Sequence, residues 1–239
     1  MALTIGTGPF GTEPAGQFNF RVPREGALYL EESPHWIRAR RGGQTVVDSK
    51  RARMLHEHGR LPVFWFPEQD VWIDALPADA VHRRDEELVA GLVTVDWAAA
   101  DEWLDEDEPL LGHARDPFHR IDVCRTSRHV RVKVGGEVVA ESTRTKALFE
   151  NGLPTRWYFP EEDVRMDLLE PTSTDTVCAY KGHASYWAVG DEKDVVWTYR
   201  DPLTDALEVK DLLAFFNERV EIEVDGEPET VIRTQWSRE

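Results

Sequence analysis

The sequence repeats itself at a spacing of 93 residues, and this repeat limits what the chain can fold into more than any other feature. An ungapped shift by 93 places residues 38–76 on residues 131–169 with sixteen identities. The identities keep one register over all 39 positions and include a Gly-Gly pair and a Phe-Pro-Glu-x-Asp-Val motif in each copy. Because chance similarity does not hold register over such a length, the chain is predicted to contain two related units.

The first half of each repeat predicts a β-hairpin. In the second copy, residues 129–134 alternate between polar and apolar side chains, as in a strand with one buried face. Gly135-Gly136 then favours a tight turn, and residues 137–140 continue as the returning strand. The Gly-Gly pair at residues 42–43 has the same place in the first copy.

The second half of the repeat predicts a short helix followed by further strands. Residues 142–151 offer Ser142 as an N-cap and helix-favouring residues in the middle, and Gly152 follows as a stop signal. Aromatic residues 157–159 and apolar residues 164–169 are typical of strands. The predicted fold class is therefore mainly β with short helices (α+β), built from antiparallel sheet.

The two copies diverge beyond Leu169. Residues 174–199 of the second copy predict two or three antiparallel strands, whereas the first copy has only residues 77–92 at the corresponding place. The first copy is therefore expected to lack a hairpin. We divide the chain into an N-terminal arm (1–27), a degenerate first repeat unit (28–112) and a complete second repeat unit (113–239).

Charge and composition exclude several classes of partner. Lys and Arg total 28 against 45 Asp and Glu, and the net charge of −17 disfavours polyanionic partners such as nucleic acids and acidic membranes. No apolar run approaches the roughly 20 residues of a membrane-spanning helix, and residues 1–10 lack the pattern of a signal peptide. The two cysteines, Cys124 and Cys178, are too few for a disulfide framework. We expect a soluble cytoplasmic protein with neither a nucleic-acid nor a membrane partner, and the oligomeric state stays open.

A glycine motif near the N-terminus resembles a dinucleotide-binding loop in spacing alone. Gly6, Gly8 and Gly11 fit the pattern G-x-G-x-x-G. That motif needs a preceding strand and a following helix to aim its backbone N–H groups at a pyrophosphate. Only five residues precede Gly6, and Pro14 discourages a helix. We therefore expect a flexible arm and no cofactor.

The histidine pairs do not have the spacing of a metal site. His56 and His58 are two residues apart, and residues with this spacing on a helix point away from each other. The second copy has Phe149 and Asn151 at the matching positions, so it could not ligate a metal there. His113 with His119 makes no better case, and no metal is expected.

Candidate ligand-binding residues concentrate in the second copy. The stretch from 178 to 199 combines aromatic side chains with a few polar groups, which is the composition of a small-molecule pocket. Lys181 would offer an ammonium group there, and Gly182 would allow close approach of the backbone. The candidates are Tyr180, Lys181, His183, Ser185, Tyr186, Trp187, Trp197, Tyr199, Arg144 and Cys178.

Three functions remain open from the residues alone. The first is a binding protein whose second unit holds an aromatic cleft bounded by Trp187 and Trp197. The second is an enzyme acting on a small molecule or nucleotide, with Lys181, His183 and Cys178 as the reactive groups. The third is a structural scaffold. Arg144 and Glu150 recur as Arg51 and Glu57, which favours a structural ion pair or anchor shared by both copies.

The ordered motifs of the two copies resemble one family. These motifs are the Gly-Gly hairpin, Ser-Lys-Arg or Ser-Thr-Arg at 49–51 and 142–144, Leu-x-Glu-x-Gly, Phe-Pro-Glu-x-Asp-Val, and the segment from Cys178 to Trp187. Together they resemble domain-of-unknown-function family 427, also catalogued under a nucleotidyltransferase-like label, in the tandem form found in bacteria. The chain departs from the family in having Ala179 where Pro is usual and in lacking the Cys-Pro-Tyr-Lys-Gly segment in its first copy.

The resemblance implies a fold and leaves the reaction open. It implies two tandem β-tent-like domains, in each of which two antiparallel sheets lean together over a ligand-sized cleft without the zinc-binding cysteines of other β-tents. A nucleotidyltransferase would need a Gly-Ser loop and spaced carboxylates for magnesium. The chain contains no Gly-Ser dipeptide. A small molecule is accordingly the expected partner.

Overall fold

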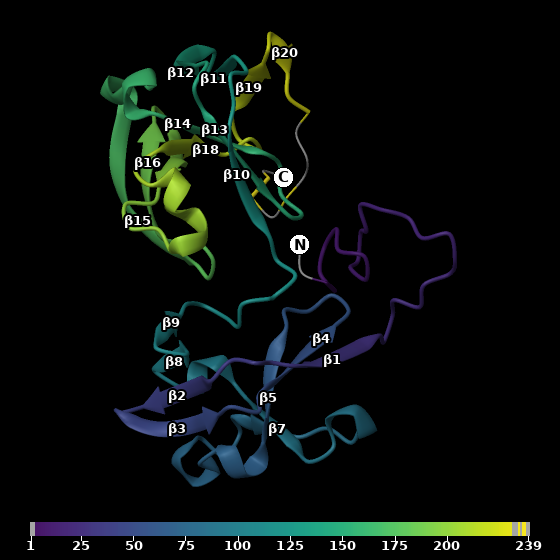
Figure 1. Ribbon diagram of the computed structural model, residues 1–239. Coiled ribbons are helices and arrows are strands. Elements are labelled where there is room, and N and C mark those ends of the chain that lie inside the picture. The colour runs from purple at the N-terminus through teal and green to yellow at the C-terminus, as the bar shows by residue number, and fades with distance from the viewer. Residues whose placement is uncertain (1–2, 231–233, 235, 238–239) are drawn as a thin grey trace. The chain divides into compact units, whose positions relative to one another are not determined.

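The computed structural model describes residues 3–230, 234 and 236–237, and the chain divides into two compact units, Met1–His119 and Arg120–Glu239. Each unit contains two sheets (Figure 1). All pairings between the named strands are antiparallel, and the helices of the described residues are single 3-10 segments. None of these helices has the length and apolar character needed to span a bilayer. The expectation of mainly β, antiparallel structure is confirmed.

The first unit has a five-stranded sheet of order β1-β4-β5-β7-β6 and a four-stranded sheet of order β3-β2-β8-β9. The strands are β1 Leu28–Glu32, β2 Ile37–Arg41, β3 Gln44–Ser49, β4 Arg53–Glu57, β5 Val63–Pro67, β6 Val81–His82, β7 Leu92–Val95, β8 Glu102–Asp105 and β9 Glu108–Leu110. The 3-10 segments are η1 Glu68–Asp70, η2 Ile73–Ala75, η3 Glu87–Val89 and η4 Trp97–Ala99.

The second unit has a seven-stranded sheet of order β10-β13-β14-β18-β17-β16-β15 and a four-stranded sheet of order β12-β11-β19-β20. The strands are β10 Ile121–Arg125, β11 Val130–Val134, β12 Glu137–Ser142, β13 Lys146–Glu150, β14 Arg156–Phe159, β15 Leu169–Cys178, β16 Gly182–Val189, β17 Glu192–Thr198, β18 Leu213–Phe215, β19 Glu221–Val224 and β20 Glu227–Pro228. The 3-10 segments are η5 Glu161–Asp163, η6 Met166–Leu168 and η7 Thr204–Val209.

The sequence repeat is also a structural repeat. Strands β1 to β5 and segments η1 and η2 recur as β10 to β14, η5 and η6 at the same spacing in the chain. The predicted Gly-Gly turns are confirmed, because Gly42 and Gly43 join β2 to β3 with φ of 55° and 76°, and Gly135 and Gly136 join β11 to β12 with φ of 58° and 85°. Positive φ at two successive positions is the conformation for which Gly is favoured.

The helix predicted over residues 142–151 is wrong, since this segment contains strand β13. β13 pairs with β10 on one side and with β14 on the other. Two adjacent residues of β13, Ala147 and Leu148, are buried on opposite faces of the sheet, in two different apolar clusters. Pairing and burial on both faces outweigh the helix propensity of these residues.

Ser142 caps a turn rather than a helix. Its hydroxyl accepts a hydrogen bond from the Arg144 N–H and donates to Asp163 at 2.6 Å. The first unit has the same arrangement, in which Ser49 bonds to Asp70 at 2.8 Å and to the N–H of Arg51.

The strand predicted over residues 164–169 is largely wrong. Val164 makes one isolated bridge to Ala140, and η6 follows before β15 begins at Leu169. Arg144 and Ser142 both bond to Asp163, which ties η5 to the end of β12. By contrast, the antiparallel strands predicted within residues 174–199 are confirmed as parts of β15, β16 and β17.

The core of each unit lies between its two sheets. In the second unit, Val132 and Ile222 of the small sheet belong to the same buried cluster as Phe159 and Phe215 of the large sheet. In the first unit, the corresponding cluster contains Ala39 and Trp103 of the small sheet and Phe66 and Val93 of the large sheet. We call the side of each large sheet that faces this core its inner face.

The N-terminal arm, expected to be flexible, folds into a succession of hydrogen-bonded turns. The N–H groups of Gly8 and Gly11 donate to the carbonyls of Ile5 and Gly8 at 3.0 and 2.9 Å. At Gly11 a side chain would collide with the backbone, because a Cβ atom would overlap the Gly6 carbonyl oxygen. The Gly motif therefore serves to close a compact loop.

Removing the Asp163 carboxylate should destabilise the second unit. Asp163 accepts hydrogen bonds from Ser142 and from Arg144 Nε and Nη2 at 2.6, 2.9 and 2.8 Å. We expect Asp163→Ala to lower the free energy of unfolding by about 2 kcal/mol, the scale of hydrogen bonds to charged groups. Urea unfolding measures this change. Asp167→Ala is the control, because Asp167 pairs only with the exposed Arg165 in the described structure and should contribute less than about 0.5 kcal/mol.

Candidate functional site

Aromatic side chains gather on the face of the seven-stranded sheet opposite the inner face. The strand register places Tyr158, Ala214, Trp197 and Tyr186 in one row across β14, β18, β17 and β16. Phe216, just beyond β18, packs on Trp197 with ring centroids 4.5 Å apart. We call the set Tyr158, Tyr186, Trp197, Tyr199 and Phe216 the aromatic face.

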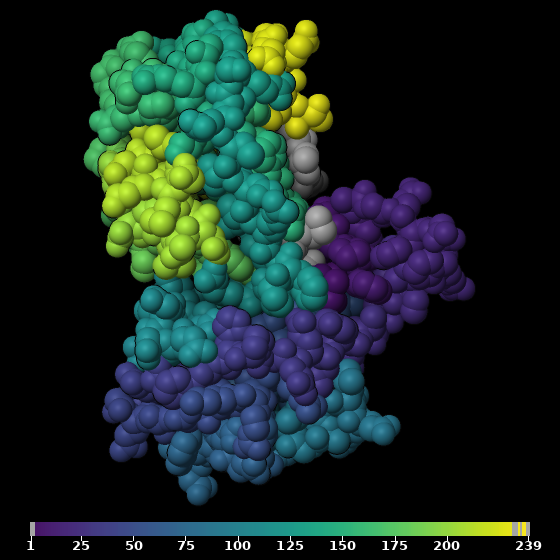
Figure 2. All heavy atoms as spheres, viewed as in Figure 1, coloured from purple at the N-terminus to yellow at the C-terminus, as the bar shows by residue number. Residues whose placement is uncertain are grey.

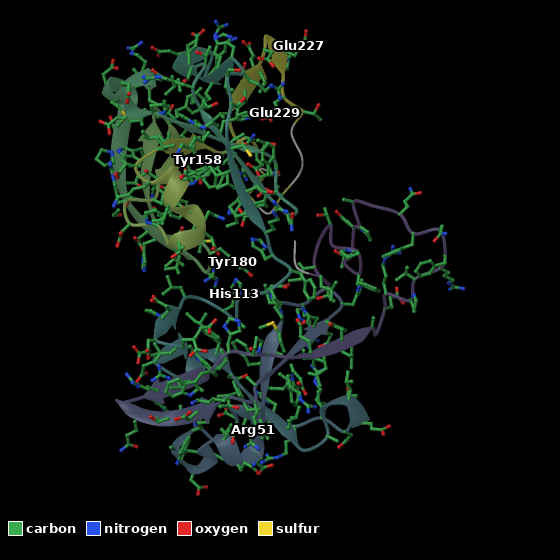
Figure 3. The ribbon with its side chains drawn as sticks, viewed as in Figure 1. Arg51, His113, Tyr158, Tyr180, Glu227 and Glu229 are labelled. Atoms are coloured by element: carbon green, nitrogen blue, oxygen red, sulfur yellow. The ribbon has the colours of Figure 1, made fainter. Side chains whose placement is uncertain are left out.

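Strand alternation explains why this face is aromatic. Trp157 and Phe159 point into the core, so Tyr158 between them points the other way. Figure 3 labels Tyr158 within the second unit. Its hydroxyl accepts a hydrogen bond of 3.2 Å from Trp197 Nε1, and their rings meet edge to face. Each buried polar tip thus finds a partner in the other ring.

Segment η7 covers part of the aromatic face. Its residues Ala206 and Val209 are buried in the same cluster as Leu148, Tyr158 and Trp197. In Figure 2 the yellow-green part of the chain that contains η7 lies against the teal of β10. Tyr186 stays partly exposed at the other side of the row, whereas Trp197 and Tyr199 are each 6% exposed.

A buried ion pair lies beside the aromatic face. Lys181, in the turn before β16, donates from Nζ to Glu150 Oε2 at the end of β13, at a distance of 2.6 Å. Both side chains are less than a tenth exposed. Burial raises the pKa of the Tyr199 hydroxyl far above its ordinary value, and the nearby Tyr158, Cys178 and Glu150 raise it further. Hydroxyl, thiol and carboxylate groups therefore converge here.

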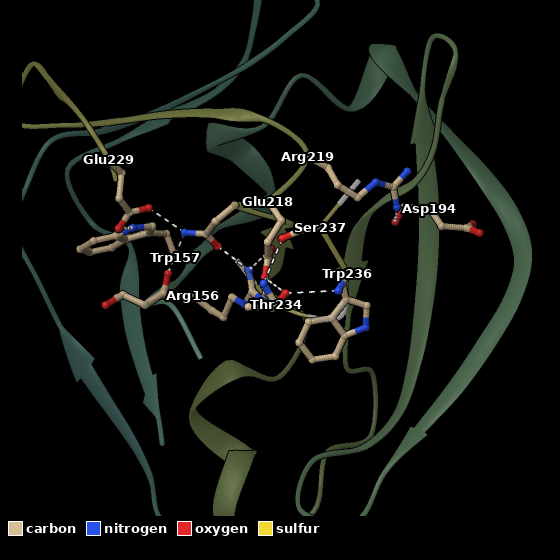
Figure 4. A network of polar contacts seen from close by, with 11 residues as sticks. Arg156, Trp157, Asp194, Glu218, Arg219, Glu229, Thr234, Trp236 and Ser237 are labelled. Carbon is tan, nitrogen blue, oxygen red and sulfur yellow. Dashed lines mark hydrogen bonds and ion pairs between the residues drawn. The ribbon is translucent and has the colours of Figure 1, made fainter. Parts of the chain in front are cut away.

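Arg156 forms a second buried network on the same side of the unit (Figure 4). Its guanidinium bonds to both carboxylate oxygens of Glu218 at 2.7 Å and to Asn217 Oδ1 at 2.6 Å. The guanidinium carbon lies 5.6 Å from the Trp197 ring centroid and 5.7 Å from that of Phe216, within cation–π range. The charged pair of Arg156 and Glu218 is therefore in contact with the rings of the aromatic face through its guanidinium.

The pKa of Glu218 reflects two opposed effects. Burial alone would raise it, but the hydrogen bonds from Arg156 and Thr234 and the charge of Arg156 hold it below its usual range. Glu218 is therefore a carboxylate at neutral pH, and its charge is neutralised by Arg156.

Three of the sequence candidates lie on the other side of the sheet. Trp187 pairs with Val196, packs against the core cluster and is only partly buried. His183 and Ser185 are exposed on the same side of β16, where His183 Nδ1 lies 3.0 Å from Asp175 Oδ1. Because Trp187 and Trp197 occupy opposite faces, they do not bound one cleft.

Arg144 and Cys178 have different surroundings. Arg144 pairs with Asp163 at 2.8 Å, as Arg51 pairs with Asp70 at 2.5 Å in the first unit, so both act as anchors of the turn after β14 or β5. Cys178 ends β15, is partly exposed and lies close enough to Tyr199 to affect its pKa. Tyr180 is buried in the turn between β15 and β16.

The structure adds residues that sequence reasoning did not place at the site. Tyr158, Phe216 and Arg156 belong to the aromatic face or its network, and Glu150 binds Lys181. The recurrence of Glu150 as Glu57 marked this residue in the sequence, but the sequence did not identify Lys181 as its partner. Tyr158 could have been assigned from its place between two core aromatics. Phe216 lies outside the repeated stretch and carried no signal.

The histidines of the first unit have separate partners. His56 Nε2 lies 2.8 Å from Glu31 Oε1, whereas His58 Nδ1 lies 2.8 Å from the carbonyl oxygen of Phe10. Across the described residues, no group of three or more His, Cys, Asp or Glu side chains is arranged to hold a metal ion.

Two comparisons bear on what the chain is similar to. A family model described as a domain of unknown function (DUF427) matches residues 29–86 and 122–226, together more than half of the sequence. The matched segments fall one in each compact unit. A search of curated proteins finds no match.

Proposed function

The chain belongs to the DUF427 family, whose description assigns no activity, and from its geometry we propose that the second unit binds a small planar organic molecule at the aromatic face. The observation that carries this proposal is the convergence of aromatic rings with the buried Glu150–Lys181 pair and the tyrosine hydroxyls. Apolar, aromatic surroundings with a few convergent polar groups are typical of small-molecule sites.

Stability alone does not account for this composition. Replacing a buried ion pair by apolar residues of similar volume is often neutral or stabilising, so such a pair is weak evidence for a purely structural role. Burial raises the pKa of the Tyr158 and Tyr199 hydroxyls, so both stay protonated at neutral pH and can donate a hydrogen bond.

The charge of the site supports an uncharged ligand. Lys181 is neutralised by Glu150, and Arg156 is neutralised by Glu218. A charged ligand would lose its hydration without gaining an unpaired counter-charge. A planar heteroaromatic or amide-bearing molecule would instead stack on Tyr186, the partly exposed ring of the aromatic face, and bond to the Tyr199 hydroxyl.

Ligand screening tests the proposal with one tyrosine variant and one serine variant. Neutral heteroaromatic compounds are screened by thermal shift, and the Kd of each hit is measured by isothermal titration. We expect Tyr199→Phe to raise Kd about 2- to 10-fold, which is the net worth of one hydrogen bond. Ser185→Ala is the matched control, because it removes a hydroxyl from the opposite, exposed face of the same sheet and should leave Kd unchanged.

The outcomes separate the three functions. Equal Kd values for the wild type and Tyr199→Phe, or no hit at all, would count against a site on the aromatic face. Conversion of a hit to product that stops in Cys178→Ala would instead identify an enzyme, in which the thiol near Tyr199 reacts.

A further inference from the structure

An apolar cavity of about 430 Å³ lies in the first unit, along the edge strand β1. Its volume falls within the range of small-molecule sites. No charged side chain is among its lining residues, which include Leu3, Phe10, Ala27, Leu28, Tyr29 and Phe118. We propose that this cavity is a second binding site, independent of the aromatic face, for an uncharged molecule of one or two aromatic rings.

The N-terminal loop is a built wall of the cavity. Thr4 is 2% exposed, and its carbonyl accepts a hydrogen bond of 2.8 Å from the Gly59 N–H in the turn after β4. His58 Nδ1 lies 2.8 Å from the carbonyl oxygen of Phe10. Residues on both sides of the glycine motif are therefore attached to the turn after β4, and the N-terminal loop places Leu3 and Phe10 at the cavity.

Two aromatic rings present exposed apolar surface at the cavity. Tyr29 and Phe118 are 46% and 41% exposed although both line it. Their rings rest on His56, with centroids 5.7 and 5.5 Å away, and His56 is fully buried with Glu31 at 2.8 Å. The buried His56 thus supports the rings of Tyr29 and Phe118, and an apolar ligand in the cavity would remove these two rings from water.

Side chains at the cavity differ from those at the matching positions of the second unit. By the repeat register, Asp122 stands in the second unit where Tyr29 stands in the first, and Phe149 stands in place of His56. Phe149 is 47% exposed, and the strands β10 and β13 that carry these residues pair as β1 and β4 do. The shared fold therefore does not require the cavity; side chains of the first unit and its N-terminal loop create it.

Charge and size define the ligand. An anionic ligand would find no cationic side chain in the lining, and the Glu31 carboxylate beside His56 and the net charge of −17 would repel it. A cationic ligand is disfavoured because the apolar walls offer it no partner. An uncharged bicyclic molecule such as indole suits both the volume and the aromatic lining.

Binding of indole to the full chain, followed by ligand-observed NMR, tests this site. We expect saturable binding, and indole-3-acetate should bind about tenfold more weakly or worse. Ala27→Trp fills the cavity and should weaken indole binding by about tenfold or more. Tyr29→Asp, which introduces the residue of the second unit, should have the same effect and serves as the second variant if Ala27→Trp misfolds. Thermal melting verifies folding of each variant.

Phe149→Ala is the matched control, because it removes an exposed aromatic ring from the corresponding strand of the second unit. It should leave the Kd of indole unchanged. Unaltered binding in folded Ala27→Trp and Tyr29→Asp would overturn the proposal, as would weakening by Phe149→Ala equal to that of Tyr29→Asp. Loss of binding in Tyr199→Phe alone would move the indole site to the aromatic face and would also overturn it.

Discussion

Replacing Lys181 with Met should lower the free energy of unfolding of the second unit by about 3–5 kcal/mol, the usual cost of breaking a buried ion pair. The change leaves the Glu150 carboxylate buried without the ammonium that lies 2.6 Å away. Amide hydrogen exchange in β14 and β16 measures this loss for the second unit alone. Unchanged protection in these strands would contradict the prediction.

A double variant separates the cost of removing the ammonium alone from the net contribution of the whole ion pair. Lys181→Met combined with Glu150→Leu removes both charges, and we expect it to recover most of the lost stability. The matched control is Arg84→Met in the first unit, where Arg84 bonds to Glu57 at 2.8 Å but both side chains are more than a quarter exposed. Because water can solvate the remaining carboxylate, this change should cost about 1 kcal/mol or less.

The repeated glutamate forms its ion pair with a different cationic residue in each unit. Glu57 and Glu150 occupy the same place at the ends of β4 and β13. Lys181 comes from the turn between β15 and β16, and Arg84 comes from the segment that occupies residues 77–92 of the first unit. Carboxylate and cation therefore persist together even where the surrounding chain differs, which indicates that the repeated Glu needs a neutralising partner in this fold.

The repeat made much of the fold predictable. A fixed offset carried the Gly-Gly turns from one copy to the other, alternation identified β11, and the turn then placed β12 as the returning strand. The error over residues 142–151 had a physical cause. Local propensity favoured a helix there, whereas Ala147 and Leu148 are buried on two faces of a sheet that only distant strands complete.

The candidate site was predictable in part. The segment 178–199 was recognised by composition, but composition does not assign faces. The pairing of β16 with β17 places Tyr186 beside Trp197 and Trp187 beside Val196, and this pairing depends on a register shift between Trp187 and Val189. Arg156 begins β14, whereas Phe216 and Glu218 follow β18, so tertiary structure was needed to bring them together.

Replacing Arg156 with Met should destabilise the second unit by about 3–5 kcal/mol at neutral pH, because the buried carboxylate of Glu218 would lose the guanidinium that neutralises it. The effect should depend on pH with a definite sign. In the wild type the pKa of Glu218 is held below its ordinary value of 4.5, so its contribution to stability is present above that value and is lost as the pH falls through the lowered pKa.

In Arg156→Met the same carboxyl loses the guanidinium, and burial then raises its pKa. Protonation relieves the buried charge, so the gap in stability between the wild type and the variant should narrow as the pH falls below about 5. Glu218→Gln is the control, because it keeps the shape of the side chain and removes its titration. Urea unfolding between neutral and acidic pH measures all three proteins. A gap that stays constant with pH would show that Arg156 acts by packing against Trp197 and Phe216 rather than by neutralising Glu218.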